Sequence, residues 1–247
     1  DSIAFLRSRG RTVFYDAEHF FDGFKGNPDY TLATIVAAAS AGAECIILCD
    51  TNGGTLPWEV ERIVRDLKLV IKTPFGIHTH NDGECAVINS LMAVREGAIQ
   101  AQGTINGVGE RCGNANLISI MADLELKMGH QCLPEGKLEN LYELSHFVAE
   151  VANLTPDEHL PFVGKSAFAH KGGVHVAAMR RSPQSYQHIE PEKIGNKMRV
   201  VVSDLSGRGN LLSKAEEHGV EVEGEEVVGV LNDIKELESR GFSFEAA

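Results

Sequence analysis

The chain has 247 residues, of which 43% are hydrophobic and 23% are charged. That composition is typical of a folded globular protein and excludes a disordered or low-complexity chain. With 35 acidic residues against 23 lysines and arginines, the net charge of −12 excludes nucleic acid and anionic membranes as favoured partners.

The five cysteines are odd in number and include no Cys-x-x-Cys pair. They predict reduced thiols in a cytoplasmic protein rather than a disulfide framework or a zinc knuckle. No apolar run reaches the roughly 18–20 residues of a membrane span. The chain begins at Asp1, without a methionine and inside a helical pattern over residues 1–9. We therefore expect a fragment of a longer protein.

Residues 12–104 alternate strand and helix patterns. The expected strands are 12–15, 45–49, 75–77 and 99–102, and the expected helices between them are 28–41, 55–70 and 84–96. The strands begin about 24 to 33 residues apart, the length of one βα unit. Gly10, Gly42 and Gly97 follow helical stretches, where glycine commonly ends a helix. Four such units in series predict a parallel sheet with right-handed crossovers.

Helices are also expected at 114–128, 138–152 and 222–240. The helix at 28–41 would bury a face of Leu32, Ile35, Val36 and Ala39, and the one at 138–152 a face of Leu141, Leu144, Phe147, Val148 and Val151. From residue 155 the sequence becomes rich in His, Gly and Pro. We therefore divide the chain into a βα region at 1–153 and a helical and irregular subdomain at 154–247.

Polar residues follow every expected strand: Asp16, Glu18, Asp50, Thr51, His78, His80 and Asn106. An open doubly wound sheet and a (β/α)8 barrel both fit four units in series. An open sheet concentrates functional residues at one switch point, whereas a barrel spreads them around its C-terminal rim. The distribution favours the barrel, of which four units would be one half.

The sharpest local motif is GIHTHND at residues 76–82. Residues i and i+2 of a strand point to the same side, so His78 and His80 face the same space. Two neutral imidazoles there suit Mn, Fe, Co, Ni or Zn, especially with oxygen ligands beside them. The motif alone also fits two rim histidines that only form hydrogen bonds.

Other candidate groups are less specific. Asp16 and Glu18 share a face and fit outer-shell metal partners or acid/base groups, but equally a helix cap or a solvated loop. The stretch GTINGVGERCGN at 103–114 misses the dinucleotide fingerprint by one residue, although phosphate could still bind at the helix N-terminus after it. The stretch HKGGVH at 170–175 places titrating groups among glycines, and histidine is the usual proton shuttle. Cys112 lacks the local pattern of a nucleophile.

GIHTHND, QGTINGVGERCGN and FAHKGGVH occur in an order and spacing that resemble the 2-isopropylmalate, homocitrate and citramalate synthases, which are acyl-CoA-dependent Claisen condensation enzymes. The resemblance covers the whole chain. PDEHLPFVGKSAFAHKGGVH and RVVVSDLSGRGNL are most similar to the citramalate synthase branch. The resemblance implies an α/β fold, namely the second half, strands five to eight, of a TIM (β/α)8 barrel. A mainly helical subdomain follows and leads toward a missing regulatory domain.

The same resemblance implies an acyltransferase that condenses acetyl-CoA with a 2-oxo acid, pyruvate in the citramalate branch, in branched-chain amino-acid biosynthesis. It implies a divalent metal (Mn, Mg, Zn or Co) held by His78, His80 and Asn114, together with an Asp from the missing half. That metal would chelate the oxo acid and act as a Lewis acid at its carbonyl.

The family's remaining functional residues also have matches here. Thr51 matches the threonine that binds the substrate carboxylate, and Glu18 the active-site glutamate, with Asp16 as a further substrate-binding candidate. His175 and Tyr186 match a catalytic pair in the subdomain after the barrel. In relatives that histidine reaches over the partner chain's barrel and helps to deprotonate the acetyl-CoA methyl, which implies a homodimer.

The family's first strand supplies an Arg-Asp pair, and no such segment exists here. We therefore expect this chain alone to be an incomplete enzyme, a poor catalyst and not a monomer. Three alternatives stay open. They are a 2-isopropylmalate synthase acting on 2-oxoisovalerate, a metal-dependent aldolase or lyase of the same superfamily, and a non-catalytic assembly fragment.

Overall fold

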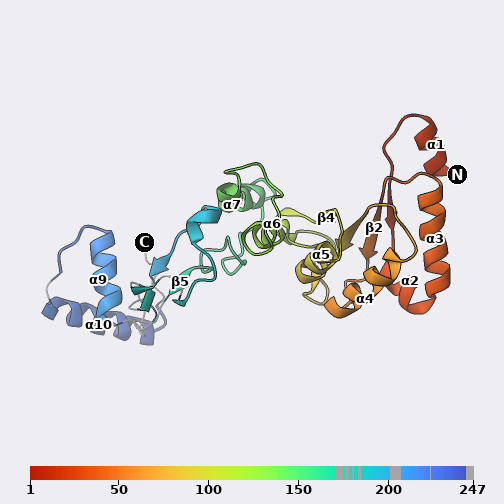
Figure 1. The fold of residues 1–247 in the computed structure, drawn as a ribbon. Helices are drawn as coiled ribbons and strands as arrows, with labels where there is room; N and C mark the ends of the chain where they lie inside the picture. The colour runs from red at the N-terminus through yellow and green to blue at the C-terminus, as the bar shows by residue number, and fades with distance from the viewer. Residues whose placement is uncertain are drawn as a thin grey trace. The chain divides into compact units, whose positions relative to one another are not determined.

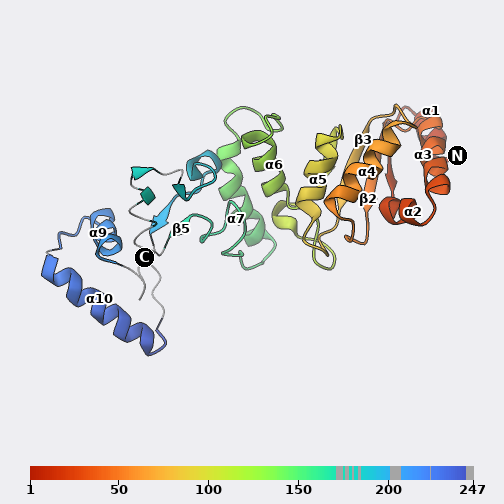
Figure 2. The ribbon, with the colours of Figure 1, turned by 60° about the horizontal axis from the view of Figure 1, so that its bottom comes forward.

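The structure is a computed structural model that describes residues 1–170, 175, 178–179, 181–182, 185–200, 207–222 and 224–242. The chain forms two compact units, Asp1–Cys132 and Leu133–Ala247 (Figures 1 and 2). The division predicted between residues 153 and 154 falls inside the second unit. It stays a prediction about where the catalytic region ends.

The first unit alternates strands and helices along the chain. Its elements are α1 (Ser2–Ser8), β1 (Phe14–Ala17), α2 (Phe20–Gly26), α3 (Pro28–Ser40), β2 (Cys45–Asp50), α4 (Pro57–Lys68), β3 (Phe75–Thr79), α5 (Ala86–Arg95), β4 (Gln100–Gln102), η1 (Ile105–Gly107) and α6 (Leu117–Leu126). The strands form a four-stranded sheet in the order β1-β2-β3-β4, and each neighbouring pair is parallel. The predicted α/β fold with a parallel sheet is confirmed.

Strand β2 lies at the centre of the core and is buried along its whole length. Its Ile46 and Leu48 pack into the main hydrophobic cluster with the helices, whereas Cys45, Ile47 and Cys49 form a separate cluster on the opposite face. Helices α2 and α3 contact β2, and α5 contacts β3. Figure 2 shows α3, α4 and α5 following one another along the sheet. The helices therefore stabilise one face and leave the other face for function.

Glycines end the helical stretches before β1, β2 and β4, as the sequence predicts. Gly10, Gly42 and Gly97 have φ angles of +72°, +96° and +108°, a region that side chains rarely adopt. Gly76 in β3 is needed for another reason. A Cβ atom there would lie 2.7 Å from the Cδ1 atom of Ile47 and 3.0 Å from the carbonyl oxygen of Gln100. A larger residue at this point would therefore push against both neighbouring strands.

In its described residues, the second unit consists of helices and a short strand pair. Its elements are η2 (Leu138–Asn140), α7 (Leu141–Val151), β5 (Ala169–His170), η4 (Pro191–Ile194), β6 (Arg199–Val200), α9 (Arg208–Glu217) and α10 (Gly224–Ser239). Strands β5 and β6 pair in parallel. Within the described ranges, no helix combines the length and the apolar character that crossing a membrane requires.

Two of the predicted helix faces are right in part: Leu32, Ile35 and Ala39 pack in the core and Leu141 is buried, but other members of each face are exposed. In α3 the side chain of Val36 is 40% exposed, and Ala38 is buried instead. In α7 the large side chains of Phe147 and Val151 are exposed, whereas the small residues Ser145 and Ala149 are buried. Small side chains allow a helix to approach its neighbour closely, so the packed face need not carry the largest apolar residues.

Two leucines at the end of α4 provide a matched test of this core. Leu67 is fully buried, while Leu69 is 83% exposed. We expect Leu67→Ala to lower the free energy of unfolding by about 2–5 kcal/mol, because it leaves a cavity. Leu69→Ala should change it by less than about 0.5 kcal/mol. Urea denaturation followed by circular dichroism measures both; equal effects would contradict the packing described here.

Candidate functional site

The carboxyl ends of the four parallel strands lie at one edge of the sheet. Register pairs Cys49 with His78, and His78 with Gln102. Paired residues on adjacent strands point to the same face, so these three side chains form a row across β2, β3 and β4. This row lies on the face opposite the helices, at the end of the sheet where parallel α/β proteins bind substrates.

The three predicted metal ligands lie together at this edge. The rings of His78 and His80 are 5.3 Å apart between centroids. Asn114 forms an isolated antiparallel bridge with His80. On either side of that bridge, the amide of Asn81 donates to the carbonyl of Gly113 at 2.9 Å, and that of Ala115 to the carbonyl of Thr79 at 3.0 Å. The glycine-rich stretch therefore returns to the end of β3.

Two polar atoms of this group are buried without a partner. Within the described part of the chain, His80 Nδ1 and Asn114 Oδ1 accept or donate no hydrogen bond. An unpaired buried polar atom costs about 1–3 kcal/mol, so its presence needs an explanation. An imidazole nitrogen and an amide oxygen both carry lone pairs that a cation can use. The residues present therefore fit a divalent metal.

Other groups near these histidines are not arranged as further ligands. Among the described residues, no group of three or more His, Cys, Asp and Glu side chains could hold a metal. Burial, with the charges of Glu18 and Asp16, raises the pKa of the Cys49 thiol to about 12. Cys49 is therefore a neutral thiol at neutral pH in the metal-free chain.

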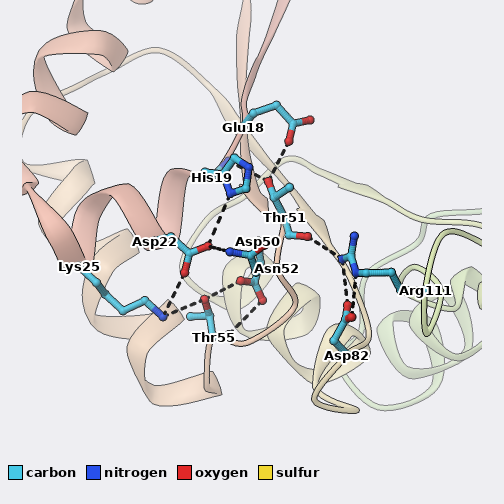
Figure 3. Close-up of polar contacts among 10 residues, drawn as sticks. All are labelled: Glu18, His19, Asp22, Lys25, Asp50, Thr51, Asn52, Thr55, Asp82 and Arg111. Atoms are coloured by element: carbon cyan, nitrogen blue, oxygen red, sulfur yellow. Dashed lines mark hydrogen bonds and ion pairs between the residues drawn. The ribbon is translucent and has the colours of Figure 1, made fainter.

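Glu18 and Thr51 are in direct contact (Figure 3). The Thr51 hydroxyl donates to Glu18 Oε2 at 2.8 Å and accepts from the backbone amide of His19 at 2.8 Å. The two predicted substrate-binding residues therefore come together from the loops after β1 and β2. Asp16 is exposed on β1, and its charge adds to the effect of burial, which is the main cause that raises the pKa of Cys45 and Cys49.

Sequence reasoning missed Arg111, which links the loops after β2, β3 and β4. Its guanidinium donates to both carboxylate oxygens of Asp82, at 2.8 and 3.0 Å, and to the carbonyl of Thr51 at 2.7 Å (Figure 3). The Arg111 guanidinium holds the pKa of the Asp82 carboxyl below its usual value. Arg111 lies in the motif QGTINGVGERCGN, but the sequence does not indicate which carboxylate an arginine in a loop will contact.

Asp50 ends β2, as the sequence predicts, but its side chain is buried. Its side chain is 1% exposed and accepts hydrogen bonds from the Thr55 hydroxyl at 2.6 Å and the Thr55 amide at 3.3 Å. Burial raises the pKa of this carboxyl. Its backbone carbonyl accepts from the amide of His80 at 3.2 Å. The hydrogen bonds of Asp50 therefore hold the loop after β2 and help to orient the end of β3.

Several rim residues adopt a strained backbone. In the first unit, the residues other than glycine with a positive φ angle are His19, Glu84, Asn106 and Arg111, at +55° to +63°; Asn153 and Phe162 of the second unit share this conformation. This left-handed region is costly for residues with a side chain, and such residues concentrate at functional sites. Each of the four lies in a loop that follows β1, β3 or β4. The strain therefore coincides with the edge that carries the candidate ligands.

In the second unit, His175 and Tyr186 stack with ring centroids 4.2 Å apart and an interplanar angle of 26°. His170 lies 6.5 Å from each of them. Burial, assisted by His175, lowers the pKa of His170. The predicted pair is therefore together in space, with a third ring beside it. The glycines between the two histidines, at 172 and 173, lie outside the described residues.

Arg111 offers a test of how the rim loops are held. We expect Arg111→Gln to speed hydrogen exchange at the amides of His80 and Asn81, because the loops after β2, β3 and β4 lose their shared partner. Overall stability should change little, since the ion pair is solvent-exposed. Arg65→Gln, which removes exposed ion pairs with Glu61 and Glu96, is the matched control. Unchanged exchange in Arg111→Gln would contradict the role assigned to Arg111.

Comparison with known proteins shows which family the chain belongs to. The HMGL-like family model matches residues 1–148, and a homocitrate synthase post-HMGL domain-like model matches residues 162–241. An (R)-citramalate synthase of Geobacter sulfurreducens is 57% identical, over 100% of this chain and 47% of that relative. Another, from Synechocystis sp., is 49% identical over the same shares of both chains.

A solved structure of Rhizobium etli pyruvate carboxylase matches with a TM-score of 0.50 and 20% identity, over 62% of this chain and 15% of that one. At that identity the likeness concerns the fold alone. The chain spans about half the length of the curated relatives it matches. The resemblance drawn from the three sequence motifs is confirmed, and the chain belongs to the HMGL-like family.

Proposed function

We propose that the protein containing this chain is an acyltransferase that condenses acetyl-CoA with pyruvate to form citramalate. The observation that carries the proposal is the pair of buried, unpartnered lone-pair atoms, His80 Nδ1 and Asn114 Oδ1, found next to His78 within the described residues. The two relatives reported above, at 57% and 49% identity, are both named (R)-citramalate synthases, which favours pyruvate as the acceptor.

We place the sheet of the first unit as strands five to eight of a (β/α)8 barrel. The sheet is open, with β1 and β4 as its edges, and Phe14 on β1 is 48% exposed. A closed barrel has no such edges. The remaining length of the relatives is sufficient for the other strands. The two free edges of such a half-barrel would also be covered in the working protein. This supports the expectation that this chain alone is not a monomer.

His78, His80 and Asn114 would hold the divalent metal, be it Mn, Mg, Zn or Co. When bound there, the metal polarises the keto carbonyl of the 2-oxo acid as a Lewis acid. The Thr51 hydroxyl, now bonded to Glu18, would donate instead to the carboxylate of the oxo acid. That exchange frees the Glu18 carboxylate to carry a proton.

His175 would remove a proton from the methyl group of acetyl-CoA, with its ring held by the stacked Tyr186. The methyl carbon then forms a bond to the keto carbon of pyruvate as the carbonyl π bond opens, and the keto oxygen takes up a proton to become a hydroxyl. Water hydrolyses the thioester to release coenzyme A. A thioester methyl is a weak carbon acid, so the base and the electrophile must be held together. We further propose a homodimer, in which the second unit supplies His175 to the partner's barrel.

Two alternative functions would use residues of the same site. A 2-isopropylmalate synthase would use the same residues with 2-oxoisovalerate in place of pyruvate, and a thiol-release assay with both acids distinguishes the two. An aldolase or lyase of the same superfamily would share the metal site. The stacked His175–Tyr186 pair favours the synthase, since that chemistry needs a base for acetyl-CoA.

A cytoplasmic location rests on the five free cysteines.

Metal binding tests the first half of the proposal. We expect His78→Ala or His80→Ala to abolish stoichiometric Zn²⁺ binding by the full-length protein, because each removes one of two imidazole ligands. Inductively coupled plasma mass spectrometry after dialysis measures the bound metal. His130→Ala, which removes an exposed histidine outside the cluster, should bind as the parent does. Stoichiometric metal in the double variant would contradict the site.

Proton exchange tests the second half. We expect His175→Ala in the full-length protein to slow deuterium exchange at the acetyl-CoA methyl by about 10²–10⁴-fold, the usual contribution of a general base. Binding of the 2-oxo acid should be unchanged. His159→Ala, another exposed histidine of the same unit, serves as the control. Exchange at the parental rate in His175→Ala would assign the base to Glu18 or another group.

A further inference from the structure

Gln102, the last residue of β4, contacts the first candidate metal ligand. It is the register partner of His78, and its Oε1 atom lies 3.0 Å from His78 Nδ1. An amide oxygen has no proton to give, so a hydrogen bond at this distance requires the proton on His78 Nδ1. The other ring nitrogen, Nε2, then keeps its lone pair.

We propose that Gln102 is a positioning residue that keeps neutral His78 in the Nδ1–H tautomer, so that Nε2 is the atom offered to the metal. This inference rests on the proposed metal site and deepens it. A neutral imidazole has only one free lone pair, so the group bonded to one nitrogen decides which nitrogen can ligate. The opposite tautomer would present an N–H group to the cation and could not bind it.

The strand geometry allows this contact. Gly76 lies two residues before His78 on the same face of β3, and a Cβ atom there would lie 3.0 Å from the carbonyl oxygen of Gln100 and 3.1 Å from its Cβ. The absence of a side chain at Gly76 therefore lets β4 approach β3 just below the site. That approach brings the amide of Gln102, two residues after Gln100, within hydrogen-bond distance of the imidazole.

The two histidines differ in the hydrogen bonding of their Nδ1 atoms. Gln102 occupies His78 Nδ1, whereas His80 Nδ1 has no hydrogen-bond partner among the residues that the structure describes. A change at Gln102 should therefore alter the protonation pattern of one imidazole and leave that of the other unchanged. This difference provides an internal reference for the experiment.

Three variants of the full-length protein separate positioning from simple packing. Gln102→Met keeps the length of the side chain and removes the acceptor. Gln102→Glu keeps an acceptor for Nδ1–H and should rescue the contact. Gln100→Met, on the same strand and face, makes the same chemical change at a residue whose Oε1 contacts no described hydrogen-bond donor. Zn²⁺ alone, without substrate, is the probe.

We expect Gln102→Met to weaken Zn²⁺ binding by about 10- to 100-fold in calorimetric titration, as losses of such outer partners do. Gln102→Glu and Gln100→Met should stay close to the parent. Long-range ¹H–¹⁵N spectra of the metal-free parent should show His78 as the Nδ1–H tautomer. In Gln102→Met they should show a mixture of tautomers for His78 and an unchanged pattern for His80.

Two results would overturn the inference while leaving the metal site in place. One is an Nε2–H tautomer of His78 in the metal-free parent, which the parent alone reveals even where a variant fails to fold. The other is parental Zn²⁺ affinity in a folded Gln102→Met protein in which His78→Ala has lost the metal. If His78→Ala itself keeps parental affinity, the metal site is wrong, and the role of Gln102 is wrong with it.

Discussion

The parallel alignment of β1 to β4 is the constraint on which the rest of the site depends. It brings the carboxyl ends of all four strands to one edge, so every loop that follows a strand meets its neighbours there. His80 and Asn114 are distant in the sequence and meet only because the loop after β4 returns to the end of β3. The same alignment brings Thr51 to Glu18, and Arg111 to Asp82.

Below that edge the sheet is buried and packed, and at the edge it is strained. Strand β2 is buried along its length and packs its Ile46 and Leu48 against the helices. At the rim, left-handed backbone conformations and unpaired buried atoms cost free energy that the core must offset. A site whose ligands must be held in place needs this combination, because a loose scaffold would relax and let the unpaired atoms find partners.

Periodicity predicted most of the first unit, because alternation and helical spacing are local properties. The two-residue spacing of His78 and His80 was enough to place them on one face. Helix α2 was missed because it is seven residues long and contains glycine at 23 and 26, although its phenylalanines are buried. The exposed Phe147 and the contacts of Arg111 were not predictable, since each depends on which neighbour the fold supplies rather than on the local pattern.

The contact between Gln102 and His78 shows why register is the hardest of these properties to predict. Strand β4 has only three residues, and a slip of one residue would turn Gln102 to the helix-covered face. Before the strand, the Ile99 amide donates to the Phe75 carbonyl at 2.9 Å. After it, the Thr104 amide donates to the carbonyl of Ala115, whose own amide donates to the Thr79 carbonyl of β3, both at 3.0 Å. These bonds involve the backbone, so no side-chain pattern reveals them. The chemistry available to His78 therefore depends on backbone pairing outside the strand that carries it.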